Sequence, residues 1–143
     1  MKITNKRANF EYELENERIE AGVSLSGGEA KAIRTVHADL SQSVARIVGG
    51  EVWLINANIP VLGAKNYIST RSRKLLLHKG EILSISTKMK QRRLTLVPLK
   101  LYTTGRLIKL ELALGKPKRK FEKKEAIKRK DIEREIAREV GSR

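Results

Sequence analysis

The sequence predicts a mainly β fold, in which about six short antiparallel strands form a small closed or partly open barrel. Three observations lead to this fold class. Apolar runs rich in β-branched residues flank glycine-containing turns, helical spacing of apolar residues is confined to short stretches, and the composition becomes highly charged from Lys116 onwards. We therefore expect two to three flanking helices and a basic C-terminal tail beside the strands.

The first strand signal lies in residues 10–25. Phe10, Tyr12 and Leu14 alternate with polar residues there, as in a half-buried strand. We expect one or two strands in this segment. Residues 1–9, which precede it, are polar and basic, and we expect them to form a flexible arm.

Two hairpins follow. In "VARIVGGEVWLIN", β-rich runs flank Gly49 and Gly50, which supply the positive φ angles of a tight turn. The second hairpin is "LTLVPLKLYTTGRLIKLELAL". Its first strand is apolar on both faces, which predicts a central, covered strand, and Pro98 requires a bulge or a missing ladder partner. In its second strand Ile108, Leu110, Leu112 and Leu114 face one way, and Lys109, Glu111 and Ala113 face the other.

The stretch "SGGEAKAIRTV" predicts a helix. Ser26 can cap its N-terminus while Glu29 reaches back, as in a capping box. Ala30, Ile33 and Val36 would form a narrow apolar face. The two glycines resemble a phosphate-binding loop only weakly, because no lysine–threonine ending follows, so we interpret them as a tight turn into the helix.

Residues 71–90, between the hairpins, show a helical period. Leu75, Ile82 and Met89 are seven residues apart, as apolar residues on one helix face are. Gly80 interrupts this pattern and weakens a helix by about 1 kcal/mol relative to alanine. We therefore expect either a kink there or two short helices.

Residues 116–143 differ in kind from the rest of the chain. They carry twelve basic and six acidic residues, and Ile132, Ile136 and Val140 form a thin apolar stripe at helical spacing. Such a stripe buries little area, so the segment is predicted to be disordered alone and to fold on a partner. Residues 1–115 would then form the β-barrel domain.

The net charge of +15 on 143 residues indicates a polyanionic partner, with nucleic acid as the first candidate and an anionic membrane surface as the second. Aromatic residues make up only 4% of the chain, which disfavours a stacking platform for single strands and favours folded RNA read through its shape and phosphates. The cations fall into clusters, which are Lys6 with Arg7, Lys31 with Arg34, Arg71 to Lys74, Lys88 to Arg93, and Lys116 to Lys120.

Several classes of protein are disfavoured by composition. The chain has no cysteine, which argues against disulfides and thiolate metal sites and fits the reducing cytoplasm. Its two histidines, His37 and His78, have no acid–base partner at a recognisable spacing, so we expect no enzyme activity, no metal and no cofactor. No apolar run is long enough for a signal peptide or a membrane span.

Four blocks of the sequence resemble, in order and spacing, the bacterial SsrA-binding protein family (small protein B). They are "NKRANFEYEL…IEAGVSLSGGEAKAIR", "GGEVWLINANI", "TRSRKLLLHKGEI" and "LTLVPLKLY". The resemblance runs from about Asn5 to the C-terminus, and the last two blocks are its most specific part. Departures occur at "NYIST", where the family often has histidine–aspartate–proline, and at Glu122-Lys123-Lys124, where aspartate–lysine–arginine is usual.

The resemblance implies an oligonucleotide-binding-type barrel and a protein that is not an enzyme. Its partner would be the tRNA-like domain of transfer-messenger RNA (tmRNA, or SsrA RNA). The complex would enter stalled 70S ribosomes for trans-translation, ribosome rescue and peptide tagging, with the tail helical in the mRNA channel near the decoding site. Elongation factor Tu and alanyl-tRNA synthetase would be indirect partners through the RNA. The protein itself would be a monomer without membrane contact.

The resemblance also implies a set of site residues. The RNA-binding set comprises Asn5, Lys6, Arg7, Glu20, Lys31, Arg34, Arg71, Arg73, Lys74, Leu76 and His78. The ribosome-contacting tail set comprises Glu122, Lys123, Lys124, Ile127, Lys128, Arg129, Lys130 and Arg134. Leu76 is open to two interpretations, a core residue or an apolar contact to RNA, and His78 is either a helix cap or an RNA contact. The alternative function is a structural ribosomal or ribosome-assembly protein.

Overall fold

A computed structural model of the chain describes residues 2–119. The tail contacts predicted between Glu122 and Arg134 lie outside the described residues. The elements follow in the order β1 (Lys2–Thr4), α1 (Ala8–Glu11), β2 (Tyr12–Val23), α2 (Gly27–Arg34), β3 (Val44–Val48), β4 (Glu51–Ile55), β5 (Arg73–Leu76), α3 (Lys79–Arg92), β6 (Thr95–Thr104) and β7 (Leu107–Pro117).

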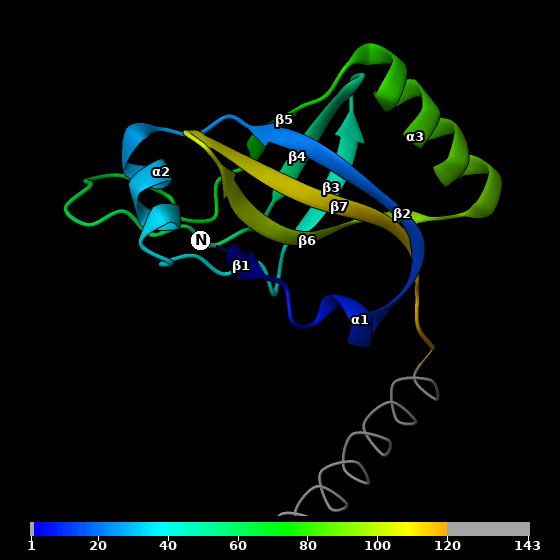
Figure 1. The fold of residues 1–143 in the computed structure, drawn as a ribbon, viewed down its shortest axis with the longest axis horizontal. Helices are drawn as coiled ribbons and strands as arrows, with labels where there is room; N and C mark the ends of the chain where they lie inside the picture. The colour runs from blue at the N-terminus through cyan, green and yellow to red at the C-terminus, as the bar shows by residue number, and fades with distance from the viewer. Residues whose placement is uncertain (1, 120–143) are drawn as a thin grey trace, which may run out of the picture.

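Six strands form a ring in which every neighbouring pair is antiparallel (Figure 1). Their order is β6–β3–β4–β5–β2–β7, and β7 pairs again with β6. Strand β1 pairs with β6 from Lys100 to Tyr102, whereas β3 pairs with it at Leu96. The mainly antiparallel β architecture with flanking helices is therefore confirmed.

Both hairpins form as expected. Gly49 and Gly50 have positive φ angles in the tight turn between β3 and β4. Strand β6 is central, since it pairs with β1, β3 and β7, and its register with β7 shifts between Pro98 and Lys100. It is covered only in part, because Leu96 to Pro98 are buried whereas Lys100 and Tyr102 are partly exposed. Proline lacks the N–H that a regular ladder needs, which accounts for this irregularity.

The interior of the ring is filled by aliphatic side chains. The strand register places Leu75, Ala21, Leu110, Leu101 and Ile3 on the inner face of the ring, and all five are buried. Because side chains alternate along a strand, their sequence neighbours point outwards. The positions of the inward-facing residues thus determine which residues of β1, β2, β5, β6 and β7 face outwards, where a ligand could bind.

The prediction for residues 71–90 was partly wrong. Residues Arg73–Leu76 form strand β5 with alternating burial, and α3 begins only at Lys79. Gly80 lies in the first turn of α3, which continues unbroken to Arg92, so the expected kink is not found. The seven-residue spacing of the apolar residues was misleading because a four-residue strand is too short to show its own period.

Two smaller expectations also need correction. The predicted flexible arm includes a strand, because Ile3 enters the core opposite Leu101 and thereby anchors β1. Helix α2 has the predicted capping box, but it buries Ala32 and Ile33, whereas Val36 lies beyond its end and is exposed.

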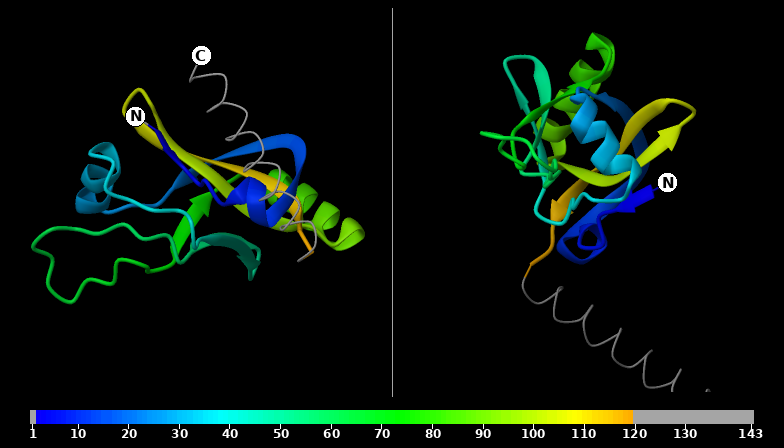
Figure 2. Two further views of the ribbon diagram at one scale, coloured as in Figure 1. Left: turned by 90° about the horizontal axis from the view of Figure 1, so that it is seen from below. Right: turned by 90° about the vertical axis from the view of Figure 1, so that its left-hand side faces the viewer.

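Helices α2 and α3 lie at opposite ends of the strand ring (Figures 1 and 2). The long connection between β4 and β5 runs beside α2, and α1 lies near the start of β2 (Figure 2). Among the described residues, no helix combines the length and the apolar character that crossing a bilayer requires.

Candidate nucleic-acid interface

The outward-facing side chains of five adjacent strands form one continuous surface. The register aligns Leu76, Gly22, Lys109, Tyr102 and Lys2 in a single row across β5, β2, β7, β6 and β1. Residues paired in this way share a face of the sheet. A second row joins Glu20, Glu111, Lys100 and Thr4. We call these two rows the outer sheet face.

Polar contacts hold the centre of the outer sheet face. The Tyr102 hydroxyl donates a hydrogen bond to Glu20, and Lys100 Nζ lies 3.0 Å from Glu111 Oε2 and 5.7 Å from the centre of the Tyr102 ring. Burial and the hydrogen bond to Glu20 raise the pKa of Tyr102 to about 12, so its hydroxyl keeps its proton. A carboxylate has about four acceptor sites, so Glu20 can accept further hydrogen bonds from a base or a 2′-hydroxyl.

At its α2 end the outer sheet face opens into a cleft of about 250 Å³. Leu76 and Leu107 provide apolar lining, and Arg34 and Arg106 provide positive charge. The Arg34 Nη2 donates a hydrogen bond to the Arg106 carbonyl at 2.7 Å, which fixes the guanidinium beside the hairpin turn. Leu76 is 55% exposed in this cleft, so it belongs to the surface and not to the core.

The remaining predicted cations are spread around this surface. Lys6 and Arg7 lie in the turn between β1 and α1, and Arg7 pairs with Glu11 at 3.0 Å. Lys31, on α2, lines a separate pocket of about 370 Å³. Lys74 points outwards from β5 and pairs with Glu51 at 3.2 Å.

A buried charge cluster fixes α2 to the ring of strands. We call it the Glu29 cluster, and its members are Ser26, Glu29, Tyr67, Arg71 and Arg73. The Glu29 side chain is fully buried and accepts from Arg73 Nε at 2.6 Å, Arg71 Nε at 3.1 Å, the Tyr67 hydroxyl at 3.0 Å and the Ser26 amide at 2.8 Å.

Arg73 has no exposed surface, and its remaining donors are also used. They reach the carbonyls of Ala57, Ser69 and Arg71 and the Tyr67 hydroxyl at 2.8–3.0 Å. Within the described residues, no buried side-chain nitrogen or oxygen lacks a hydrogen-bond partner. The cluster is therefore fully satisfied, which is the condition under which buried charges are tolerated.

The electrostatics of Glu29 follow from these contacts. Burial alone would raise the pKa of Glu29, but the hydrogen bonds from Arg71, Ser26 and Arg73 outweigh burial and lower the pKa to about 2. Burial, followed by the hydrogen bond to Glu29, raises the pKa of Tyr67. The carboxylate is thus ionised and the phenol is protonated across the ordinary pH range.

Two predicted site residues are buried in the structure. Arg73 is enclosed in the Glu29 cluster, and Asn5 is 7% exposed, with its side-chain amide donating to the Pro98 carbonyl at 2.9 Å. Both side chains hold other parts of the fold in place through these hydrogen bonds. Arg71 is partly exposed but is engaged by Glu29. His78 is exposed at the N-cap of α3, where its amide donates to Glu81 Oε1 at 3.1 Å.

Several residues of this surface were not predicted from the sequence as site residues. They are Lys2, Lys100, Tyr102, Arg106 and Lys109. A signal for three of them was present in the second hairpin. Counting outwards from the turn at Gly105 pairs Tyr102 with Lys109, and the outward-facing alternation then adds Lys100. Lys2 could not be found in this way, because a three-residue strand gives no pattern.

The described residues contain no group of three or more His, Cys, Asp or Glu side chains that could hold a metal ion. What the geometry offers is a cationic sheet face with a tyrosine, an acceptor carboxylate and an apolar cleft. A ring of antiparallel strands with such a face has the features of an RNA-binding β-protein.

Comparison with known proteins identifies the family. The family model described as SmpB protein matches residues 2–142, so the chain belongs to the SmpB protein family. It is 43% identical to the SsrA-binding protein of Chlorobaculum tepidum, over 94% of this chain and 87% of that one. It is 46% identical to the SsrA-binding protein of Sulfurihydrogenibium sp. (strain YO3AOP1), over 93% of this chain and 89% of that one.

A solved structure is similar as well. It is described as "tmRNA-SmpB: a journey to the center of the bacterial ribosome", and its matching chain is 39% identical to this one, with a TM-score of 0.67. The match covers 88% of this chain and 94% of that chain.

Proposed function

We propose that this protein binds the tRNA-like domain of tmRNA and delivers it to stalled ribosomes, where rescue and peptide tagging follow. Membership of the SmpB family supports the choice of RNA, and the outer sheet face is the observation that carries the proposal for this chain. The protein acts by recognition, without catalysis. Elongation factor Tu and alanyl-tRNA synthetase would join through the RNA.

The proposed recognition divides the surface by chemistry. Lys109, Lys2 and the guanidinium groups at the α2 end would contact phosphates, which supply most of the affinity and make it sensitive to salt. Glu20 cannot bind phosphate, so it would accept from a base edge or a 2′-hydroxyl. Leu76 would pack against a base or ribose. Such a surface reads the shape of a folded RNA.

The direct test is to isolate the tagged protein from its host and to sequence the RNA that accompanies it. Purified protein should bind tmRNA with nanomolar affinity that falls as salt is added. Equal affinity for an unrelated duplex of the same length would contradict the proposal. Leu76→Asp should weaken binding at least tenfold. Leu83→Asp changes another exposed leucine, on α3 at the other end of the ring, and should not weaken binding.

The tail has a separate proposed role on the ribosome. Removal of residues 121–143 should leave tmRNA binding nearly intact and abolish peptide tagging. Filter binding and a tagging assay with the same preparation measure the two activities. Loss of both together would argue against this division of roles.

The alternative function is a structural ribosomal or ribosome-assembly protein. Its sequence basis is the strongly basic composition and the charged tail. Quantifying the protein on purified ribosomes distinguishes the two. Presence on a minor, stalled fraction fits the tmRNA function, and stoichiometric presence on every ribosome fits the alternative.

A further inference from the structure

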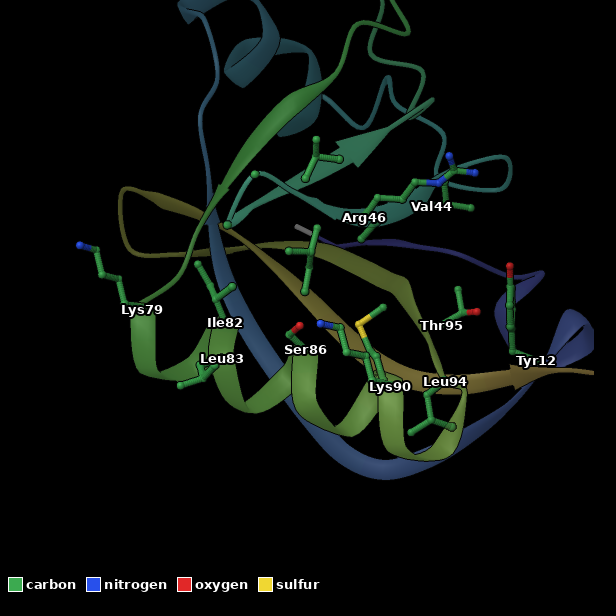
Figure 3. Close-up of a pocket in the computed structure, with 16 residues that line it drawn as sticks. Tyr12, Val44, Arg46, Lys79, Ile82, Leu83, Ser86, Lys90, Leu94 and Thr95 are labelled. Carbon is green, nitrogen blue, oxygen red and sulfur yellow. The ribbon is translucent and has the colours of Figure 1, made fainter.

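Helix α3 carries cations on two opposite sides. Lys79 and Lys90 line an apolar groove of about 900 Å³ between α3 and strand β3 (Figure 3). Both lysines are exposed, and neither forms an ion pair with another described residue. Lys88 and Arg92 are four residues apart and share the opposite side of the helix, which faces β2. The two sides differ in whether their cations are neutralised.

The side of α3 that faces β2 meets a bulge in that strand. Between Leu14 and Arg18, β2 advances four residues while its partner β7 advances two, so β2 holds two extra residues there. A bulge redirects the side chains that it carries. The Arg18 guanidinium donates to the Glu15 carbonyl, which holds the bulge in shape. Glu15 and Glu17 are directed from this bulge to α3.

Each carboxylate of the bulge covers one cation of α3. Glu17 Oε2 accepts from Lys88 Nζ at 2.8 Å, and both carboxylate oxygens of Glu15 accept from Arg92 Nη1 at 3.0 Å. The hydrogen bond from Lys88 lowers the pKa of Glu17, so this carboxylate stays charged in neutral solution. The Glu17 side chain is 64% exposed and the Arg92 side chain is 53% exposed. Ion pairs this exposed contribute little to folding stability, so their larger effect is on the charge that α3 presents to a ligand.

The boundary between α3 and the outer sheet face is acidic as well. A cleft of about 390 Å³ lies between β2 and α3, and its charged lining residues are Glu17, Arg18, Glu20, Glu81 and Lys88. Both of its cations are compensated, since Arg18 Nε lies 3.7 Å from Glu111 Oε1 and Lys88 pairs with Glu17. The cleft at the α2 end, in contrast, is lined by Arg34 and Arg106 and by no carboxylate of the described chain. A phosphate backbone that follows the outer sheet face from the α2 end therefore meets carboxylates before it reaches α3.

We propose that Glu15 and Glu17 determine specificity by keeping RNA off α3. Without these carboxylates, Lys88 and Arg92 would add to the two free lysines at the groove, and α3 would carry enough free cations for sequence-independent binding to phosphates. With the carboxylates in place, RNA is confined to the outer sheet face. Specificity of this kind comes from weakening the wrong complex, not from tightening the right one. The inference rests on the proposed function, because it concerns which RNA the protein rejects.

Binding of the full-length protein to an unrelated RNA duplex tests this inference. In the double variant Glu15→Gln/Glu17→Gln two cations become available, so the slope of log affinity against log salt should steepen by about two. Affinity for the duplex should rise about tenfold at low salt, while affinity for tmRNA should change by less than about twofold. Filter binding over a series of salt concentrations measures both RNAs with the same preparation.

Two controls separate the ion pairs from the net charge. Glu17→Gln alone should steepen the duplex slope by about one. Glu13→Gln removes another exposed carboxylate of β2, one without an ion pair to a described residue, and should leave the slope unchanged. Adding Lys88→Gln and Arg92→Gln to the double variant should return the slope to that of the parent. All of these side chains are at least partly exposed, so each variant should fold, which urea denaturation checks.

Three results would overturn the proposal. The first is a duplex slope in the double variant equal to that of the parent. The second is the same change of slope in Glu13→Gln as in Glu17→Gln, which would make net charge the cause. The third is tighter duplex binding that survives the loss of Lys88 and Arg92. A parent protein that binds tmRNA no better than the duplex would instead contradict the proposed function, and the duplex slopes would still show whether the carboxylates cover α3.

Discussion

The two long helices of this protein begin in the same way and are held in different ways. Each has a glutamate three residues after its N-cap that accepts from the N-cap amide, Glu29 at 2.8 Å in α2 and Glu81 at 3.1 Å in α3. Glu29 is then enclosed by two arginines, whereas Glu81 is exposed. Helix α2 has eight residues, three of them buried, and α3 has fourteen, of which Ile85 is buried.

This difference indicates different uses for the two ends of the molecule. The Glu29 cluster fixes the helix that carries Lys31 and Arg34, and a rigid cation loses less entropy when it binds a phosphate. Helix α3 instead leaves apolar area free in a groove of about 900 Å³ between α3 and strand β3. The α2 end thus presents rigidly held cations, and the α3 end presents exposed apolar surface.

The largest expected effect on stability comes from neutralising Glu29, which is the buried one of these two glutamates. Glu29→Gln leaves Arg73 as a buried, uncompensated cation, and breaking such a pair costs roughly 3–5 kcal/mol of unfolding free energy. Glu81→Gln changes the same position of the exposed capping box and should cost about 1 kcal/mol or less. Urea denaturation of both variants measures the contrast. Similar losses of unfolding free energy in the two variants would show that the Glu29 cluster stabilises the protein no more than a capping box alone.

The second effect is a dependence of stability on pH. The pKa of Glu29 is about 2 in the folded protein, below the ordinary value of 4.5 for a glutamate. Its contribution, about 3 kcal/mol, is therefore present above pH 4.5 and is lost as the pH falls from about 4.5 towards about 2.

The contribution of Glu29 is isolated by comparing the parent with Glu29→Gln in urea titrations across this range. The gap in unfolding free energy between them should shrink as the pH falls, because glutamine has no proton to gain. If the difference in unfolding free energy stays constant across this pH range, the charge of Glu29 is not what stabilises the protein.

Local signals in the sequence were enough to predict much of the fold. The glycine turns, the alternation in β7 and the capping box at Ser26 depend on residues close together in the chain, and all three are confirmed. The break at Pro98 also follows from the chemistry of one residue. Such features need no knowledge of distant partners.

The buried charges could not be predicted in this way. Arg73 and Lys74 are adjacent cations, yet one is fully buried and the other exposed, because only Arg73 points to the inner face where Glu29 lies. The separation of 44 residues between Glu29 and Arg73 hides their pairing from any local pattern. The same limit concealed Tyr102, whose partner Glu20 is 82 residues away.

The third prediction compares cations from the two ends of the molecule in RNA binding. Lys109→Ala, on the outer sheet face, should weaken tmRNA binding and reduce the slope of log affinity against log salt by about one, because one phosphate contact is removed. Lys90→Ala, on α3, makes the same change in net charge and should alter neither the affinity nor the slope. Filter binding at four salt concentrations measures both. Equal effects would mean that net charge alone determines affinity, without a defined surface.

The smallest effect concerns one glycine in each helix. A Cβ on Gly80, near the start of α3, would meet nothing within 4 Å, so Gly80→Ala should raise the unfolding free energy by about 0.4–1 kcal/mol through the entropy of the unfolded chain. A Cβ on Gly28, in α2, would lie 2.7 Å from Val61 Cγ1. Gly28→Ala should therefore gain less, since Val61 must move. Denaturant midpoints measure the difference, and an equal gain at both positions would show that the loop around Val61 does not press on α2.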